Sequence, residues 1–177
     1  MDYQYYMSMA LDQAKKAFQK GEFPVGCVIV EAGEVIASGA RTGTTSTLPV
    51  FSETDHAEIR ALKELEKLDK QFVPEQLTLF STMEPCLMCF GAIILSGIKT
   101  VVYSFEDPMG GGTACDLNKL PLLYSKADIN VVSGVLRQKS LDLFYNFFNK
   151  ETNLYWKNSY LEAYTLEQKK KNGVEDK

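Results

Sequence analysis

The sequence predicts an α/β fold, a three-layer α-β-α sandwich around a five-stranded mixed sheet. Short apolar runs typical of buried strands alternate with segments in which apolar residues recur every three or four positions, as in amphipathic helices. The connection between the last two of these strands is long enough for a crossover. We therefore expect strands four and five to run parallel.

The first half of the chain reads as a helix, a hairpin, a loop and a second helix. Apolar residues recur at helical spacing over Tyr5–Gln19, and Gly21 provides a C-terminal stop. Two apolar runs joined by a tight turn predict a β-hairpin over residues 24–39. The polar loop Arg41–Asp55 then leads into a helix over His56–Leu68. Its place directly before that helix favours a pocket wall over a solvated connector.

The second half repeats the alternation of strands and helices around a glycine-rich loop. We expect strands at Leu77–Phe80, Thr100–Ser104 and Ile129–Ser133, helices at Pro85–Leu95 and Leu136–Phe148, and a flexible loop at Asp107–Gly112.

The pattern divides the chain into a domain at 1–149 and a C-terminal helical extension and tail at 150–177. Aromatic and leucine residues at the start of the extension predict an amphipathic helix that docks on the domain or on a partner subunit, or that closes a neighbour's pocket; they are Leu154, Tyr155, Trp156, Tyr160, Leu161 and Tyr164. From Gln168 onward we expect a frayed, solvated tail.

The composition is that of one ordinary domain with a core. The chain has 177 residues, of which 45% are hydrophobic and 24% charged, so we expect neither disorder nor a membrane protein. The net charge of −4 weighs against a general nucleic-acid binder. Without a recognisable secretory signal or a long apolar run, we expect a cytoplasmic protein with no membrane partner.

Two short segments carry residues that suit a zinc site. Cys86 and Cys89 lie three positions apart at the start of a predicted helix, where the N-terminal partial charge favours thiolates. The only histidine, His56, begins another helix. Two thiolates and one imidazole leave the fourth position of a catalytic zinc free for water. We therefore predict one Zn²⁺ per chain, bound by these three residues.

Glu58 is the predicted catalytic residue. It lies two positions after His56, near enough to reach a water molecule at the metal. With no second histidine in the chain, this carboxylate is the candidate to take the proton and to pass it to a ring nitrogen and a departing amine. The C-x-x-C spacing alone would fit a structural zinc site or a redox pair equally well. Its combination with His-x-Glu is much more specific.

At these residues the chain resembles the zinc-dependent cytidine/deoxycytidylate deaminase superfamily, and within it the tRNA adenosine deaminase and guanine deaminase branch. The resemblance runs from about residue 5 to about residue 149 and is carried by Pro24-Val25-Gly26, by His56-Ala57-Glu58-Ile59, and by Met83-Glu84-Pro85-Cys86-Leu87-Met88-Cys89 followed by Gly91-Ala92-Ile93. It implies a deaminase domain at 1–149 with the cytidine deaminase-like fold. It also implies a homodimer with the helical side of the sheet at the interface.

The resemblance also suggests which residues meet the substrate. The amide of Ala57 would face it, and we expect Arg41, Asp107, Glu84 and Pro85 to line the same pocket. Arg41 stands where the tRNA-editing branch has asparagine. An arginine donates only, so it would prefer a carbonyl, a ring nitrogen or a phosphate, unless it points to solvent and a nearby residue replaces it. This departure counts against a standard wobble-adenosine editor.

Three functions are compatible with these residues. The first is zinc-dependent hydrolytic deamination of a free base, nucleoside or nucleotide, which releases ammonia. The alternative keeps the chemistry and takes adenosine at the wobble position of a tRNA anticodon, making inosine. The third is a non-catalytic, zinc-stabilised interaction module, which would need a fourth protein ligand from the spare thiols Cys27 or Cys115.

Overall fold

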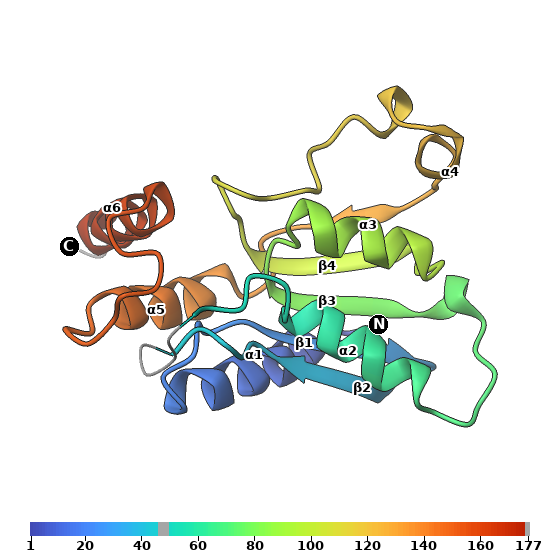
Figure 1. The fold of residues 1–177 in the computed structure, drawn as a ribbon, viewed down its shortest axis with the longest axis horizontal. Coiled ribbons are helices and arrows are strands. Elements are labelled where there is room, and N and C mark those ends of the chain that lie inside the picture. The colour runs from blue at the N-terminus through green and yellow to red at the C-terminus, as the bar shows by residue number, and fades with distance from the viewer. Residues whose placement is uncertain (46–49, 176–177) are drawn as a thin grey trace.

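The computed structural model describes residues 1–45 and 50–175, without the side chains of 173–175 (Figure 1). In chain order the elements are α1 (Tyr3–Gln19), β1 (Gly26–Glu31), β2 (Glu34–Ala40), α2 (Ala57–Glu66), β3 (Thr78–Met83), α3 (Leu87–Leu95), β4 (Thr100–Phe105), α4 (Leu122–Ser125), β5 (Asn130–Val132), α5 (Arg137–Phe148) and α6 (Tyr160–Glu175). Residues 46–49 of the expected loop Arg41–Asp55 lie outside the described part.

The strands form one mixed sheet in the order β2-β1-β3-β4-β5. β1 pairs antiparallel with β2 and with β3, whereas β3 and β4, and β4 and β5, pair in parallel. The hairpin and the parallel crossovers follow the rule that short turns join antiparallel strands and helices join parallel ones. The predicted five-stranded mixed sheet, with its last two strands parallel, is confirmed.

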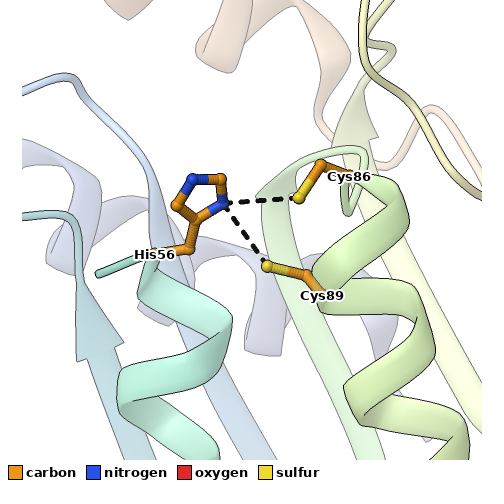
Figure 2. Close-up of side chains that lie close together, drawn as sticks. All are labelled: His56, Cys86 and Cys89. Carbon is orange, nitrogen blue, oxygen red and sulfur yellow. Dashed lines mark hydrogen bonds between the residues drawn. The ribbon is translucent and has the colours of Figure 1, made fainter. Parts of the chain in front are cut away.

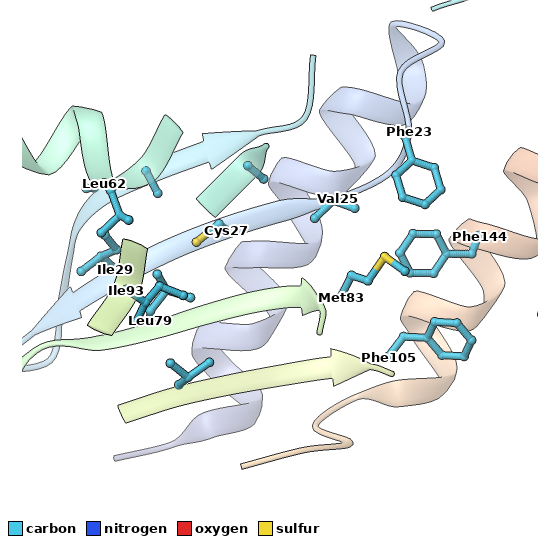
Figure 3. Packing of buried hydrophobic residues seen from close by; sticks show 14 of the residues in the cluster. Phe23, Val25, Cys27, Ile29, Leu62, Leu79, Met83, Ile93, Phe105 and Phe144 are labelled. Atoms are coloured by element: carbon cyan, nitrogen blue, oxygen red, sulfur yellow. The ribbon is translucent and has the colours of Figure 1, made fainter. Parts of the chain in front are cut away.

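Helices cover both faces of the sheet (Figure 1). Along β1, Val28 and Val30 pack with α1, while Cys27 and Ile29 pack in the cluster that contains α2 and α3. This alternation follows from the two-residue period of a strand, and both of its faces are buried. At the end of β4, Phe105 joins an aromatic group with α5 that continues the core toward the pocket (Figure 3).

A close contact sets the position of α2 on the sheet. A Cβ atom added to Gly39 would lie 2.1 Å from the carbonyl oxygen of Ala57, so β2 meets the first turn of α2 backbone to backbone. Only glycine permits this approach. The contact thereby sets the backbone positions of His56 and Glu58, which flank Ala57 in the sequence.

The C-terminal extension is more ordered than the sequence predicts. Residues 150–159 form turns, and α6 continues past Gln168 to Glu175, so the expected frayed tail is wrong for the described residues. Lys169 Nζ donates to Asp142 Oδ1 at 2.7 Å, which ties the second half of α6 to α5. We attribute the greater length of α6 to polar partners on α5, a contact that the local sequence of α6 does not reveal.

None of the helices in the described ranges is long and apolar enough to cross a membrane.

Candidate zinc centre and active site

Two helix N-termini on one face of the sheet bring the zinc ligands together. His56 is the N-cap of α2 and Cys86 is the N-cap of α3, with Cys89 one turn further into α3 (Figure 2). The helix predicted to begin at Pro85 begins at Leu87 instead. Pro85 therefore lies before the N-cap, where it fixes the entry of the chain into α3.

The geometry of the three side chains fits zinc. His56 Nδ1 lies 3.5 Å from Cys86 Sγ and 3.4 Å from Cys89 Sγ, and all three ligand atoms lie within 4.8 Å of one another (Figure 2). In a tetrahedral zinc site with ordinary Zn–N and Zn–S bonds, nitrogen and sulfur ligands are separated by about 3.6 Å. The chain therefore has a zinc site at His56, Cys86 and Cys89.

The two cysteine thiols have shifted pKa values that favour binding of a cation. The pKa of Cys86 is lowered to about 4, first because the Cys89 thiol hydrogen-bonds to its sulfur and also because His56 lies beside it. The pKa of Cys89 is raised by the same hydrogen bond and by burial, so the pair shares one proton. Binding of zinc as a thiolate complex would release that proton.

Glu58 is almost completely buried, 3% exposed, and its two oxygens have different surroundings. Oε1 accepts a hydrogen bond from Ser81 Oγ at 2.9 Å, while Oε2 lies 3.6 Å from Cys89 Sγ. Burial raises the pKa of this carboxyl group. Ser81 therefore orients the side chain so that Oε2 faces the zinc ligands.

A cavity of about 220 Å³ opens beside the ligands. Its lining residues come from the segment before β1, the loop before α2, the starts of α2 and α3, the loop after β4 and the C-terminal extension; they are Phe23, Val25, Arg41, Glu53, His56, Glu58, Met83, Glu84, Cys86, Asp107, Met109, Gly110, Tyr155, Trp156 and Leu161. Ala57 and Pro85, expected at the substrate, are not among them.

Arg41 is buried, 2% exposed, in the wall of this cavity. Nη1 donates to the carbonyl oxygens of Thr42 and Asp55, and Nη2 donates to the carbonyl of Ser52 and, at 3.2 Å, to the hydroxyl of Tyr155. The reading in which Arg41 points to solvent is therefore wrong. Its guanidinium joins the loop before α2 to the C-terminal extension.

Glu84 holds the loop after β4 in place. Its carboxylate accepts hydrogen bonds from the amides of Asp107 and Thr113, at 3.1 and 3.2 Å, and from the Thr113 hydroxyl. Asp107 Oδ1 in turn accepts from the amides of Met109 and Gly110. The structure thus brings Glu84 and Asp107 to the cavity wall, where Glu84 shapes the loop and Asp107 closes its turn.

A fourth protein ligand for the metal is missing from the described part of the chain. The group of possible ligands contains His56, Cys86 and Cys89 and no other residue. Cys27 is buried in the core and Cys115 is exposed on a loop. This arrangement leaves a coordination position for water and counts against a closed structural zinc site.

Some residues of the site carry no clear signal in the sequence. Ser81 is an ordinary polar residue within an apolar strand, and nothing in the sequence marks its bond to Glu58. Tyr155 and Trp156 line the cavity of their own chain, although their aromatic segment suggested a helix that docks on the domain or on a partner subunit, or that closes a neighbour's pocket. The density of aromatic residues after Lys150 was the only available signal.

Comparison with known proteins agrees with this site. The family described as Cytidine and deoxycytidylate deaminase zinc-binding region matches residues 1–105. The tRNA-specific adenosine deaminase of Bacillus subtilis (strain 168) is 37% identical over 145 residues, which cover 82% of this chain and 88% of that protein. The protein of the same name from Aquifex aeolicus (strain VF5) is 39% identical over 121 residues, 68% of this chain and 77% of that protein.

Solved structures share the fold. A structure from a study of A-to-I editing by tRNA:A34 deaminases superposes with a TM-score of 0.65 and 30% identity, covering 78% of this chain and 98% of that one. The guanine deaminase of Nitrosomonas europaea superposes with a TM-score of 0.62 at 24% identity, covering 81% of this chain and 83% of that one, which shows the fold alone. With its ligand set and its relatives in agreement, this chain is a zinc-dependent deaminase and belongs to the cytidine and deoxycytidylate deaminase zinc-binding family.

Proposed function

We propose that this chain deaminates adenosine in a tRNA anticodon, converting it to inosine. The observation that carries the proposal is the 37% identity to a tRNA-specific adenosine deaminase over most of both chains. The cavity beside the zinc ligands has the size for a single base, so an RNA substrate would insert one flipped nucleotide into it.

In this reaction a C–O bond forms at the carbon that bears the amine, the C–N bond breaks, and ammonia leaves. Zinc, when bound, activates the water that supplies the oxygen. Glu58 Oε2 faces the zinc ligands and moves two protons in turn: it takes one from the attacking water and gives it to the ring nitrogen, and then takes the second from the newly added hydroxyl group and gives it to the departing amine. Ser81 holds Oε1 throughout, which keeps the other oxygen aimed at the reacting atoms.

The direct test is inosine formation on an anticodon stem-loop by the zinc-loaded protein. We expect Glu58→Gln to retain zinc and to lower turnover about 10²- to 10⁴-fold, because it removes the proton carrier and leaves the ligands in place. Metal content and inosine are measured on the same preparation. A Glu58→Gln protein as active as the unchanged chain would refute the role of Glu58.

The presence of Arg41 is the observation that favours a second class of substrate, a free base or nucleoside. The tRNA-editing branch is expected to have asparagine at this position, whereas here a guanidinium bonded to protein acceptors joins the loop before α2 to the C-terminal extension. Ammonia release from adenine, guanine, cytosine and their nucleosides separates the two classes. Release from a free base without inosine in the stem-loop would replace the tRNA proposal with this one.

A further inference from the structure

Trp156 has a backbone conformation that its side chain does not favour. Its φ is +53°, in the left-handed region that bulky residues rarely adopt. Such conformations persist only where the surrounding structure enforces them, and they gather at functional sites. The indole also lines the cavity that contains His56 and Cys86.

The residue before Trp156 is held by several hydrogen bonds. Asn153 brackets the backbone of Tyr155, since its Oδ1 accepts from the Tyr155 amide at 3.0 Å and its Nδ2 donates to the Tyr155 carbonyl at 3.2 Å. The hydroxyl of Tyr155 donates to Glu53 Oε2 at 2.9 Å and accepts from Arg41. Tyr155, which precedes Trp156, is thereby held both at its backbone and at its hydroxyl group.

Burial of the indole does not explain its placement. The residue remains 40% exposed, whereas Tyr155 beside it is buried. The two rings meet edge to face, with centroids 5.9 Å apart and planes at 84°. A partly exposed aromatic ring in a cavity wall is a stacking surface for a flat heteroaromatic ligand.

We propose that Trp156 contacts the substrate, offering its indole as the surface on which the base stacks, and that Arg41, Glu53 and Tyr155 are positioning residues that hold this ring at the cavity. Each chain would thus complete its own pocket with its C-terminal extension. The inference rests on the proposed function only in that the substrate carries a nucleobase, and it holds for a free base or for RNA.

The single tryptophan of the chain makes the proposal directly measurable. Zinc-loaded Glu58→Gln protein, which turns over slowly, is titrated with adenine, guanine, cytosine, adenosine and an anticodon stem-loop while tryptophan fluorescence is recorded. We expect at least one of these compounds to quench the fluorescence saturably, because stacking brings the base against the only emitting indole. Removing zinc with a chelator is the control for non-specific quenching.

Kinetics of variants separate a contact role from a structural one. Glycine adopts positive φ without strain, so Trp156→Gly removes the ring without adding backbone strain. We expect its KM to rise roughly 10- to 100-fold, the range for losing one base–aromatic stack, with a smaller change in kcat and an unaltered Tm. Trp156→Phe should restore KM to within a few-fold. Tyr160→Ala, which truncates an exposed aromatic residue outside the cavity lining, is the matched control and should behave like the unchanged chain.

The outcomes distinguish this inference from the proposed function. Quenching and a raised KM with a free base, but no inosine in the stem-loop, would support Trp156 and refute the tRNA substrate. Deamination of either substrate with a KM that is the same in Trp156→Gly as in Tyr160→Ala, and without quenching, would overturn the role of Trp156 and leave the proposed function standing.

Discussion

Arg41 bonds to the protein around it and does not point to solvent. The side chain that would be expected to meet the base is instead surrounded by carbonyl oxygens of the loop before α2 and by the Tyr155 hydroxyl. The ring of Tyr155 also lies 5.9 Å from the guanidinium carbon. A buried cation with this many acceptors organises the backbone around it.

We expect Arg41→Ala to lower the free energy of unfolding by about 3 kcal/mol, because buried carbonyl groups would lose a charged donor. Urea unfolding of the zinc-loaded protein measures this change. Arg60→Ala is the control: Arg60 pairs with Asp55 at 3.1 Å, but its side chain is 43% exposed, so its loss should cost at most about 1 kcal/mol. Equal effects of the two substitutions would show that Arg41 is not the organising residue.

At the scale of elements, α6 docks through a small polar cluster that α5 and the end of β4 share. Glu106 accepts hydrogen bonds from the Arg137 guanidinium and from the Tyr164 hydroxyl, the latter at 2.7 Å. Burial alone would raise the pKa of Glu106, but these bonds outweigh it and leave the pKa below its ordinary value. The ionised carboxylate is therefore the form that holds α6.

The lowered pKa of Glu106 predicts how the C-terminal extension responds to a fall in pH. Because the pKa of Glu106 is lowered in the folded state, its contribution to stability is present above the ordinary value of 4.5 and is lost as the pH falls through the folded value. We expect α6 to loosen in that range, changing the fluorescence of Trp156. Glu106→Gln removes the ionisable group, so its fluorescence should lack this acid step. A step of the same midpoint and size in Glu106→Gln would assign it to another group.

The features that could be predicted from the sequence depend on residues close together along the chain. The strands and most helices follow from apolar periodicity, and the ligands follow from two short motifs whose residues act within one helical turn. The surroundings of Arg41 and the orientation of Trp156 depend on contacts across the fold; Arg41 and Tyr155 are 114 positions apart. Neither periodicity nor motif spacing indicates a contact between such distant residues. The zinc ligands could therefore be predicted from the sequence, whereas these contacts in the pocket wall could not.

At the scale of the whole molecule, a bound zinc ion would connect α2 with α3, because His56 lies at the start of α2 and Cys86 and Cys89 lie at the start of α3. Removing it with a chelator should lower Tm, since a ligand that binds only the folded chain at about 100 times its Kd stabilises it by about 2.7 kcal/mol. Thermal unfolding with and without chelator measures the change. Cys89→Ser, which lacks one ligand, should show little response to the chelator, and an equal response would place the stabilising metal elsewhere.

The outer face of α3 supports the expectation of a homodimer. Leu87 and Leu95 are each 60% exposed, and with Met88 they form an apolar stripe at helical spacing around Gly91, beside which there is open space. We expect this stripe to meet a second copy of the chain.

Light scattering after size-exclusion chromatography tests the interface. Leu95→Glu should give monomers, because it places a charge within the apolar contact, while Val73→Glu, at another exposed apolar site, should remain dimeric. A monomeric unchanged chain would refute the dimer.

The position of the aromatic wall along the chain has a consequence for biosynthesis. All the zinc ligands and Glu58 precede β4, whereas Tyr155 and Trp156 follow the last strand. Since a ribosome delivers the N-terminal part first, the nascent chain contains its metal ligands before Tyr155 and Trp156, the aromatic part of the pocket wall, have been made. A chain shortened by a premature stop after β5 would keep every group needed to hold the metal and lack the surface proposed to receive the base. Stacking of the base would then become possible later in synthesis than metal binding.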